Sequence, residues 1–229
     1  MLPDLPTAGG PQKTNRKRNS AWVRRSLIAV GIVIVLGLIA LEVRSIGMPP
    51  APATTATPPA ERPNPQIGPK DAPVTIVEFG DYACSACRLW SQFGIRQRLL
   101  AKYGDKVRFV WADFPVITLE SPKAAEAGRC AYDQNKFWEY QDYLYAHYQG
   151  VEVYNLKAYA SAIGLDRTLF DTCLDSGARK EEVLVDFRDG MNRFIDVTPT
   201  FYVNEQQISG RASLEQISAL IDPILTSAK

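Results

Sequence analysis

Histidine, cysteine and a surplus of either charge are scarce in this 229-residue chain. Its single histidine, His147, is too little for a histidine-rich metal site, and its four cysteines are too few to staple a small disulfide-rich scaffold. The formal net charge of +1 argues against a protein that works by neutralising nucleic-acid phosphates. With 46% hydrophobic and 22% charged residues, however, most of the chain can bury a core, and wholesale disorder is excluded.

The N-terminal part combines positive charge with an apolar run. Residues 1–25 carry six basic residues and one acidic residue, and the fifteen residues of Leu27–Leu41 are all apolar. A helix that continues to Ile46 reaches roughly the 30 Å of a hydrocarbon core. The run lacks the polar face of a core helix, and the first small-residue cleavage motif, Ala51–Ala53, lies well beyond it. We therefore expect a retained transmembrane anchor over residues 26–46 and not a core helix or a cleaved signal peptide.

The same charges predict how the anchor is oriented. Basic flanks stay on the cytoplasmic side, so residues 1–25 form a cytoplasmic tail and the rest of the chain lies outside. Residues 47–65 contain seven prolines among alanine and threonine, which favours an extended linker. Residues 66–229 have a comfortable size for one domain. We expect a single-pass protein of the cell membrane with an extracytoplasmic globular domain.

A strand–helix–strand unit begins the globular part. Val74–Phe79 is rich in β-branched and apolar residues, as is typical of a central strand covered on both faces. A helical pattern follows over Ser85–Tyr103, with Gly104 as its stop and Gly94 as a point where it could bend. A second strand is predicted at Val107–Ala112. Such a unit favours a right-handed crossover and a parallel pair of strands.

Helical patterns then occupy a long central stretch. Only these patterns appear over residues 121–191, after which a strand is predicted at Thr200–Val203 and a closing helix at Leu214–Thr226. A sheet whose halves are separated in this way indicates a mixed α/β domain with a helical insertion. The sheet-forming parts are then residues 66–120 and 192–229.

The candidate chemistry lies in Cys84-Ser85-Ala86-Cys87, just after the first strand. Two cysteines at this spacing can bind zinc, form an inert disulfide or act as a redox pair. A zinc site normally needs a second pair of cysteine or histidine ligands, and no such motif is present. Cys84 is expected at the start of a helix, where unpaired N–H groups and the helix dipole lower the pKa of a thiol. We therefore favour a redox pair, with Cys84 as nucleophile and Cys87 as resolving thiol.

A second element is Val197-Thr198-Pro199-Thr200. A proline before a strand can simply mark a sheet edge. Beside a strand–C-x-x-C–helix unit, we favour instead a cis bond between Thr198 and Pro199. The Thr198 backbone would then lie beside the Cys84 sulfur, ready to pair with an extended substrate segment.

Three segments carry a family resemblance: EFGDYACSACRLW, RCAYDQNKFWEY and VTPTFYVN. In this order they resemble the DsbA-like thioredoxin-fold thiol:disulfide oxidoreductases, in particular the membrane-anchored bacterial branch. The resemblance covers most of residues 66–229. It implies a thioredoxin-like α/β fold with a helical insertion, with Cys84 as nucleophile, Cys87 as resolving cysteine and Pro199 as the cis-proline.

The resemblance also implies that Glu78 is the buried acid that the family keeps under the active site. From the residues alone, a glutamate within VTIVEF is either buried for proton transfer or exposed at a strand edge. The apolar neighbours Val77 and Phe79 favour burial.

Two departures from the family pattern stand out. Ser85 and Ala86 replace the proline and histidine or aromatic residue that often lie between the cysteines, so the disulfide should be less strongly oxidising than in extreme members. Asn204-Glu205 replaces a common Asn-Gly hairpin, which would allow a longer turn.

Cys130 and Cys173 each lie on a small or apolar helical stripe. They could be two separate buried thiols that behave as small hydrophobes. In an oxidising compartment a bridge is favoured, and similar anchored members of the family carry one. We expect a structural disulfide that takes no part in the catalytic cycle.

These expectations describe a membrane-tethered enzyme that introduces disulfides into exported proteins through Cys84 and Cys87. Reoxidation would need a quinone-linked membrane partner similar to DsbB or vitamin K epoxide reductase. No metal, organic cofactor or nucleic acid is expected. The alternatives are a disulfide reductase or isomerase kept reduced by a membrane electron donor, a thioredoxin-like chaperone or binding module, and, weakest, a zinc scaffold.

Overall fold

The computed structural model of the protein describes residues 64–227. The predicted cytoplasmic tail (1–25), the predicted anchor (26–46) and almost all of the predicted linker (47–65) lie outside the described residues. Within the described part, no helix is both long and apolar enough to cross a membrane.

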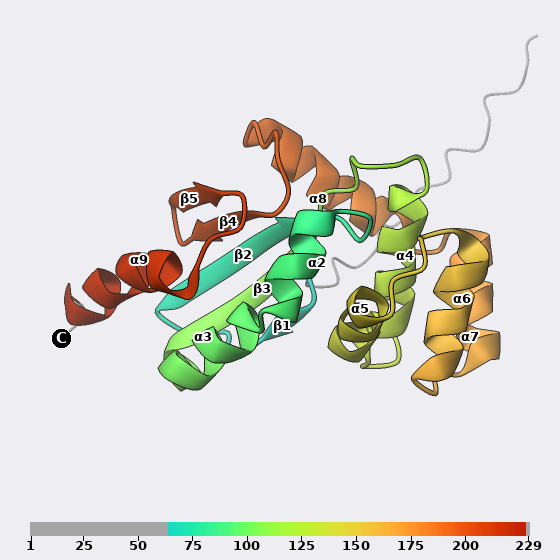
Figure 1. Ribbon diagram of the computed structural model, residues 1–229, viewed down its shortest axis with the longest axis horizontal. Coiled ribbons are helices and arrows are strands. Elements are labelled where there is room, and N and C mark those ends of the chain that lie inside the picture. Colours follow the sequence, from blue (N-terminus) through green and yellow to red (C-terminus); the bar gives the residue numbers. More distant parts are fainter. Residues whose placement is uncertain (1–63, 228–229) are drawn as a thin grey trace, which may run out of the picture. The chain divides into compact units, whose positions relative to one another are not determined.

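A five-stranded mixed sheet lies at the centre of the described domain, in the order β1-β3-β2-β4-β5 (Figure 1). The central strand β2 runs parallel to β3, and all other neighbouring pairs are antiparallel. The predicted parallel pair is therefore present, and a two-residue strand that the sequence did not predict, β1, is added beside β3. The strands are β1 (Gln66–Ile67), β2 (Val74–Gly80), β3 (Val107–Asp113), β4 (Thr200–Val203) and β5 (Gln206–Ser209).

The two faces of β2 contact different helices. Val74 and Ile76 lie in the core that includes side chains of α2 (Ser85–Gln92), α3 (Ile95–Tyr103) and α9 (Leu214–Ser227). Phe79 lies on the opposite face, next to α8 (Lys180–Asn192). Because successive strand residues point to opposite faces, Glu78 shares the face of Val74 and Ile76. The strand thus aims one carboxyl group toward the side on which α2 begins.

The single helix expected over Ser85–Tyr103 is two helices. Gly94 lies between α2 and α3 in the left-handed conformation, with φ of 64°. The N–H of Phe93 still bonds to the carbonyl of Leu89, and the N–H of Gly94 bonds to that of Ser91. The left-handed residue then turns the chain, which glycine does without steric cost.

The β4–β5 turn contains only Asn204 and Glu205, so the expected lengthening did not occur. Asn204 adopts a positive φ of 51°, which asparagine tolerates better than most residues. Its side chain accepts a hydrogen bond from the Thr75 N–H at 2.8 Å and donates to the Pro73 carbonyl at 3.2 Å. These contacts fasten the turn to the start of β2.

The predicted helical insertion lies between β3 and β4 and consists of five helices (Figure 1). Helix α5 packs against α2, and its Phe137, Tyr140 and Tyr145 are buried in a core shared with Tyr82 and Cys87. The insertion therefore contributes directly to the surroundings of the C-x-x-C motif. Besides α8, its helices are α4 (Ser121–Tyr132), α5 (Phe137–Ala146), α6 (Val153–Ala162) and α7 (Arg167–Ser176).

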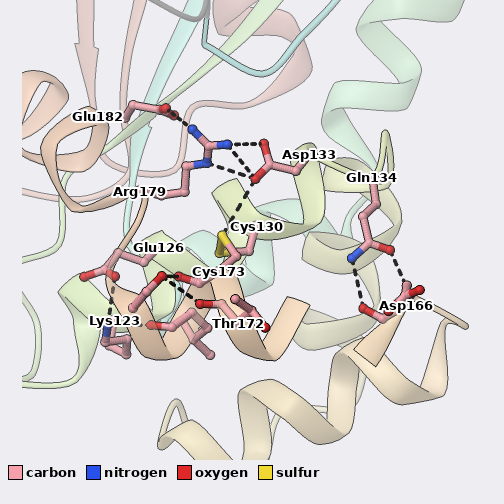
Figure 2. The surroundings of a disulfide bond; sticks show 12 residues. Lys123, Glu126, Cys130, Asp133, Gln134, Asp166, Thr172, Cys173, Arg179 and Glu182 are labelled. Carbon is pink, nitrogen blue, oxygen red and sulfur yellow. Dashed lines mark hydrogen bonds and ion pairs between the residues drawn. A yellow bond between two sulfur atoms is a disulfide. The ribbon is translucent and has the colours of Figure 1, made fainter. Parts of the chain in front are cut away.

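A disulfide between Cys130 of α4 and Cys173 of α7 ties the insertion together (Figure 2). The two Cα atoms are 5.9 Å apart, and the residues are 43 positions apart in the sequence. Closing a loop of this length stabilises a fold by about 2–4 kcal/mol. Figure 2 shows Arg179 beside the bridge, bound to the carboxylates of Asp133 and Glu182.

A buried ion cluster ties α4 to the sheet and to α8. The Arg129 side chain is buried, its Nε lies 2.7 Å from a carboxylate oxygen of Asp113 at the end of β3, and its guanidinium also pairs with Asp186 of α8. Asn64 bonds to both Arg129 and Asp186. Burial, together with the nearby Asp113 charge, raises the pKa of Asp186 to about 6, against the opposing effect of Arg129. Two buried carboxylates thus depend on one guanidinium.

Replacing Arg129 by methionine should lower the free energy of unfolding by about 3–5 kcal/mol, because it leaves two buried carboxylates without their cation. Urea unfolding at pH 7 measures this loss. Arg167→Met is the matched control, since Arg167 forms a partly exposed pair with Asp171 within one helix. That variant should lose less than about 1 kcal/mol. Equal losses in the two variants would contradict a supporting role for the buried cluster.

Candidate active site

The C-x-x-C motif lies where β2 gives way to α2. Cys84 occupies the N-cap position of α2 in an extended conformation, and its sulfur accepts the backbone N–H of Cys87 at 3.4 Å. The first N–H groups of a helix have no partner within the helix, so they are free to bind a sulfur anion. The predicted position of Cys84 at a helix start is therefore what the structure shows.

The two cysteines differ in acidity. The Cys87 thiol and the backbone amides of Cys87 and Ala86 donate to the Cys84 sulfur, which lowers the pKa of Cys84 from 9.0 to about 6 although burial opposes the shift. Burial raises the pKa of Cys87, and the neighbouring Cys84 and Glu78 act in the same direction. Cys84 retains 5% of its surface exposed and Cys87 none, so an incoming thiol reaches Cys84 first.

The segment before β4 reaches the same sulfur. The bond between Thr198 and Pro199 is cis, and the Thr198 carbonyl oxygen lies 3.2 Å from the Cys84 sulfur. The Thr198 hydroxyl is buried, and the Thr198 side chain also lowers the pKa of the Cys84 thiol. The two motifs singled out in the sequence, more than 100 positions apart, thus meet at one atom.

Glu78 lies beneath this centre and is buried. Burial raises its pKa to about 8; Arg96 opposes the shift, and a charge on Cys84 adds to it. Arg96 is itself buried and bonds to Gln141 at 2.8 Å and to Asp142 at 2.7 Å, both on α5. Of the two positions left open for Glu78, the structure therefore shows the buried one. Near neutral pH its carboxyl group keeps a proton.

Asp81 is a residue that the sequence reasoning missed. It lies in the turn between β2 and Cys84, and its carboxylate is only 1% exposed. It accepts hydrogen bonds from Ala83, Val116, Ile117 and Ser121. An acid within a short turn before a cysteine was a visible signal, but its partners 35 to 40 positions away were not.

Cys130 and Cys173 are bonded to each other, and the free thiols among the described residues are Cys84 and Cys87. Across residues 64–227, no group of three or more histidine, cysteine or acidic side chains is placed to hold a metal ion. The chemistry available at the site is therefore that of two unequal thiols, a buried protonated carboxyl group and an adjacent backbone carbonyl.

Residues 61–223 match a protein-family model whose description is Thioredoxin. The chain belongs to the thioredoxin family. This match spans both sheet-forming parts and the helical insertion, so the insertion is part of the family domain. The predicted resemblance is confirmed at the level of family and fold.

Several solved structures are similar to this thioredoxin-family chain. Oxidised BdbD from Bacillus subtilis has a TM-score of 0.65 and 26% sequence identity, covering 71% of this chain and 93% of that one. DsbA from Chlamydia trachomatis has a TM-score of 0.64, covering 72% of this chain and 91% of that one, and its 19% identity shows a shared fold alone. The thiol-disulfide exchange protein alpha-DsbA2 from Wolbachia pipientis, with a TM-score of 0.63 and 19% identity, covers 70% of this chain and is itself covered to 87%.

Other proteins that are similar to this chain in sequence are named as Na(+)/H(+) antiporters. The Na(+)/H(+) antiporter NhaA 3 of Salinispora tropica is 32% identical over 164 residues, which is 71% of this chain and 25% of that protein. The Na(+)/H(+) antiporter NhaA of Herminiimonas arsenicoxydans is 32% identical over 155 residues, 68% of this chain and 24% of that protein. The chain thus spans about a quarter of the length of these relatives.

The acidity of Cys84 can be measured by alkylation. The rate at which iodoacetamide modifies the reduced protein should rise from pH 5 to 7 and then level off, with a midpoint near pH 6, because the thiolate is the reactive form. Mass spectrometry should place the label on Cys84, since Cys87 keeps its proton. A rate that continues to rise about tenfold per pH unit up to pH 8 would show an ordinary thiol.

Glu78→Gln should stabilise the reduced protein in a pH-dependent manner. The native carboxyl group has a pKa of about 8 against 4.5 for the unfolded one, so between these values only the unfolded state ionises and Glu78 costs stability. Removing the group should raise the free energy of unfolding by about 3 kcal/mol at pH 7 and very little at pH 4. Urea titrations at both pH values, with reductant present, test this. An equal change at both would contradict a buried, protonated Glu78.

Proposed function

We propose that this domain is a thiol-disulfide oxidoreductase that works through Cys84 and Cys87 and oxidises dithiols in exported proteins. The observation that carries the proposal is the Cys84 sulfur at the N-cap of α2, held by helix amides and the Cys87 thiol with a pKa of about 6. Membership of the thioredoxin family and the fold shared with thiol-disulfide exchange proteins support it.

The reaction begins with the disulfide between Cys84 and Cys87. A substrate thiolate attacks the Cys84 sulfur, the bond between the cysteines breaks, and Cys87 leaves with the electron pair. Because burial raises the pKa of Cys87, that sulfur takes up a proton. Glu78 can supply it, since its carboxyl group is buried and protonated near neutral pH and interacts electrostatically with Cys87. The product is a mixed disulfide between substrate and Cys84.

A second substrate thiolate then attacks the substrate sulfur of the mixed disulfide. Cys84 leaves as a thiolate, and the substrate departs with a new disulfide, so two electrons have passed to the enzyme. A thiol of low pKa is the better leaving group. The unequal acidities favour this release over the reverse resolution by Cys87, which would first have to lose a tightly held proton.

The surroundings of Cys84 fit a polypeptide substrate. The Thr198 carbonyl lies beside the sulfur and is an acceptor for the backbone N–H of an extended segment. Two apolar side chains lie close to these groups in the sequence: Val197 precedes Thr198, and Leu89 is part of α2. Each is about two-fifths exposed. Unfolded exported chains present both features, backbone amides and apolar side chains.

We further propose that residues 26–46 tether the domain to the cell membrane with its catalytic part outside the cytoplasm. The Cys130–Cys173 bridge supports this location, because stable structural disulfides are typical of oxidising compartments. Reoxidation would then be carried out by a quinone-linked membrane protein similar to DsbB or vitamin K epoxide reductase. The tether would raise the effective concentration of the two partners.

The test is oxidation of a reduced protein substrate by the purified oxidised chain. Wild type should form one substrate disulfide per enzyme, and Cys84→Ser should lose this activity by at least about a thousandfold, because the disulfide between Cys84 and Cys87 can no longer form. Cys87→Ser, offered a substrate in its disulfide form, should accumulate a mixed disulfide on Cys84, because Cys84 attacks the substrate disulfide, one substrate thiolate leaves, and no second enzyme thiol is left to resolve the adduct. The matched control, Cys130→Ser with Cys173→Ser, should retain exchange.

Activity that survives Cys84→Ser would overturn the proposal. Alkylation of thiols in intact cells gives the direction of electron flow. Cys84 and Cys87 trapped mainly as a disulfide support the oxidase, whereas trapping as free thiols would favour a reductase or isomerase. A cellular role that persists after Cys84→Ala and Cys87→Ala would favour a binding module.

A further inference from the structure

Asp81 is a buried acid that the thiol chemistry does not use. It follows the last residue of β2, and its carboxylate is 1% exposed. A buried carboxylate is costly unless each oxygen is well hydrogen-bonded. Here four donors converge on it, at distances of 2.7 to 2.9 Å.

The two oxygens of Asp81 serve different segments. Oδ1 accepts the backbone N–H of Ala83 at 2.8 Å and the hydroxyl of Ser121 at 2.9 Å, so it shapes the turn that leads into Cys84 and fixes the start of α4. Oδ2 accepts the backbone N–H groups of Val116 at 2.7 Å and Ile117 at 2.8 Å. One carboxylate therefore joins the active-site turn to the loop between β3 and α4.

That loop, residues 114–120, displays apolar side chains to solvent. Val116 is 46% exposed, Ile117 50% and Leu119 95%. Its first residue is anchored separately, by the N–H of Phe114 bonding to the carbonyl of Gly80 at 2.8 Å. The hydrogen bonds to Oδ2 fix the next part of the loop. Apolar side chains on an exposed but firmly held loop are typical of a binding surface.

We propose that Asp81 is a positioning residue, which holds the loop 114–120 at a fixed place beside Cys84 so that Val116, Ile117 and Leu119 bind apolar residues flanking a substrate thiol. The inference deepens the proposed function and rests on it. What it adds is the residue that fixes the binding loop and the three side chains of that loop that meet the substrate. Asp81 touches neither the substrate nor the reacting sulfur.

Asp81→Asn separates the two tasks of the carboxylate. With its amide oxygen in the place of Oδ1, asparagine keeps the contacts to Ala83 and Ser121. Its amide nitrogen then faces the N–H groups of Val116 and Ile117, which are donors as well, so the loop loses its acceptor. Asp81→Ser is the second variant. Its hydroxyl can still accept the turn amide two residues on, but it is too short to reach the loop.

The experiment compares two substrates of the oxidised full-length chain: a peptide dithiol with leucine and valine beside its cysteines, and dithiothreitol, which has no side chains to bind. In both Asp81 variants, the KM for the peptide should rise at least about fivefold, with kcat within about twofold of wild type. The rate with dithiothreitol and the midpoint of Cys84 alkylation should stay within about twofold and 0.3 pH units of wild type. A merely structural defect would change both substrates together.

Two further variants complete the design. Leu119→Ser changes a side chain that is 95% exposed, so the fold is unaffected, and it should raise the peptide KM about threefold. Asp166→Asn is the matched control, because Asp166 accepts the N–H of Leu169 at the start of α7, away from the loop, and asparagine caps a helix equally well. It should leave both substrates unchanged.

The outcomes distinguish the two proposals. A wild-type protein that oxidises neither substrate overturns the proposed function. An active wild type whose peptide KM stays within twofold in a folded Asp81 variant, or in Leu119→Ser, overturns the positioning role alone. Equal losses with peptide and dithiothreitol overturn it as well, since Asp81 would then act on the thiol centre and not on the loop.

Discussion

The hydrogen bonds that the start of α2 offers to one sulfur are the interaction on which the rest of this domain depends. Helix amides without partners favour an anion, and the strand–turn–helix connection places the Cys84 sulfur among them. The same connection places Cys87 one turn further in, where burial favours the neutral thiol. Two identical side chains therefore acquire opposite acidities from their position alone, and this difference gives the pair its chemical direction.

The surrounding protein maintains that difference from three sides. β2 brings a buried carboxyl group beneath the pair, the segment before β4 brings the Thr198 side chain, which lowers the pKa of Cys84, and α5 of the insertion covers the interior with aromatic rings. Burial is the common cause, because it keeps Glu78 and Cys87 protonated while Cys84 escapes the same effect through its hydrogen bonds. The sheet and the insertion thus act on the same few atoms.

Local patterns made the order of elements and the place of the C-x-x-C motif at a helix start predictable, because each depends on neighbours in sequence. The apolar run before Cys84 indicates a buried strand, and the following helical pattern fixes the cysteine at a helix start. Features that depend on distant partners were out of reach: the hydrogen bonds of Asp81 to Val116 and Ile117, the opposing effect of Arg96 on Glu78, and β1, whose two residues are too few for any periodicity. Gly94 indicated a possible bend in the helix after Cys84, but only its backbone angle shows that the helix ends there and a second one begins.

Two successive residues of α4 connect this helix to different parts of the domain. Cys130 is bonded covalently to α7, while Arg129 is bound by the carboxylates of β3 and α8. These attachments differ in kind, since a reductant cleaves the first and leaves the second intact. Losing the bridge would therefore loosen the outer helices of the insertion while α4 stays fastened to the sheet. The α4 side chains that pack in the core with Cys84 and Cys87 would then keep their place, even when the thiols that reduce this pair also reduce the bridge.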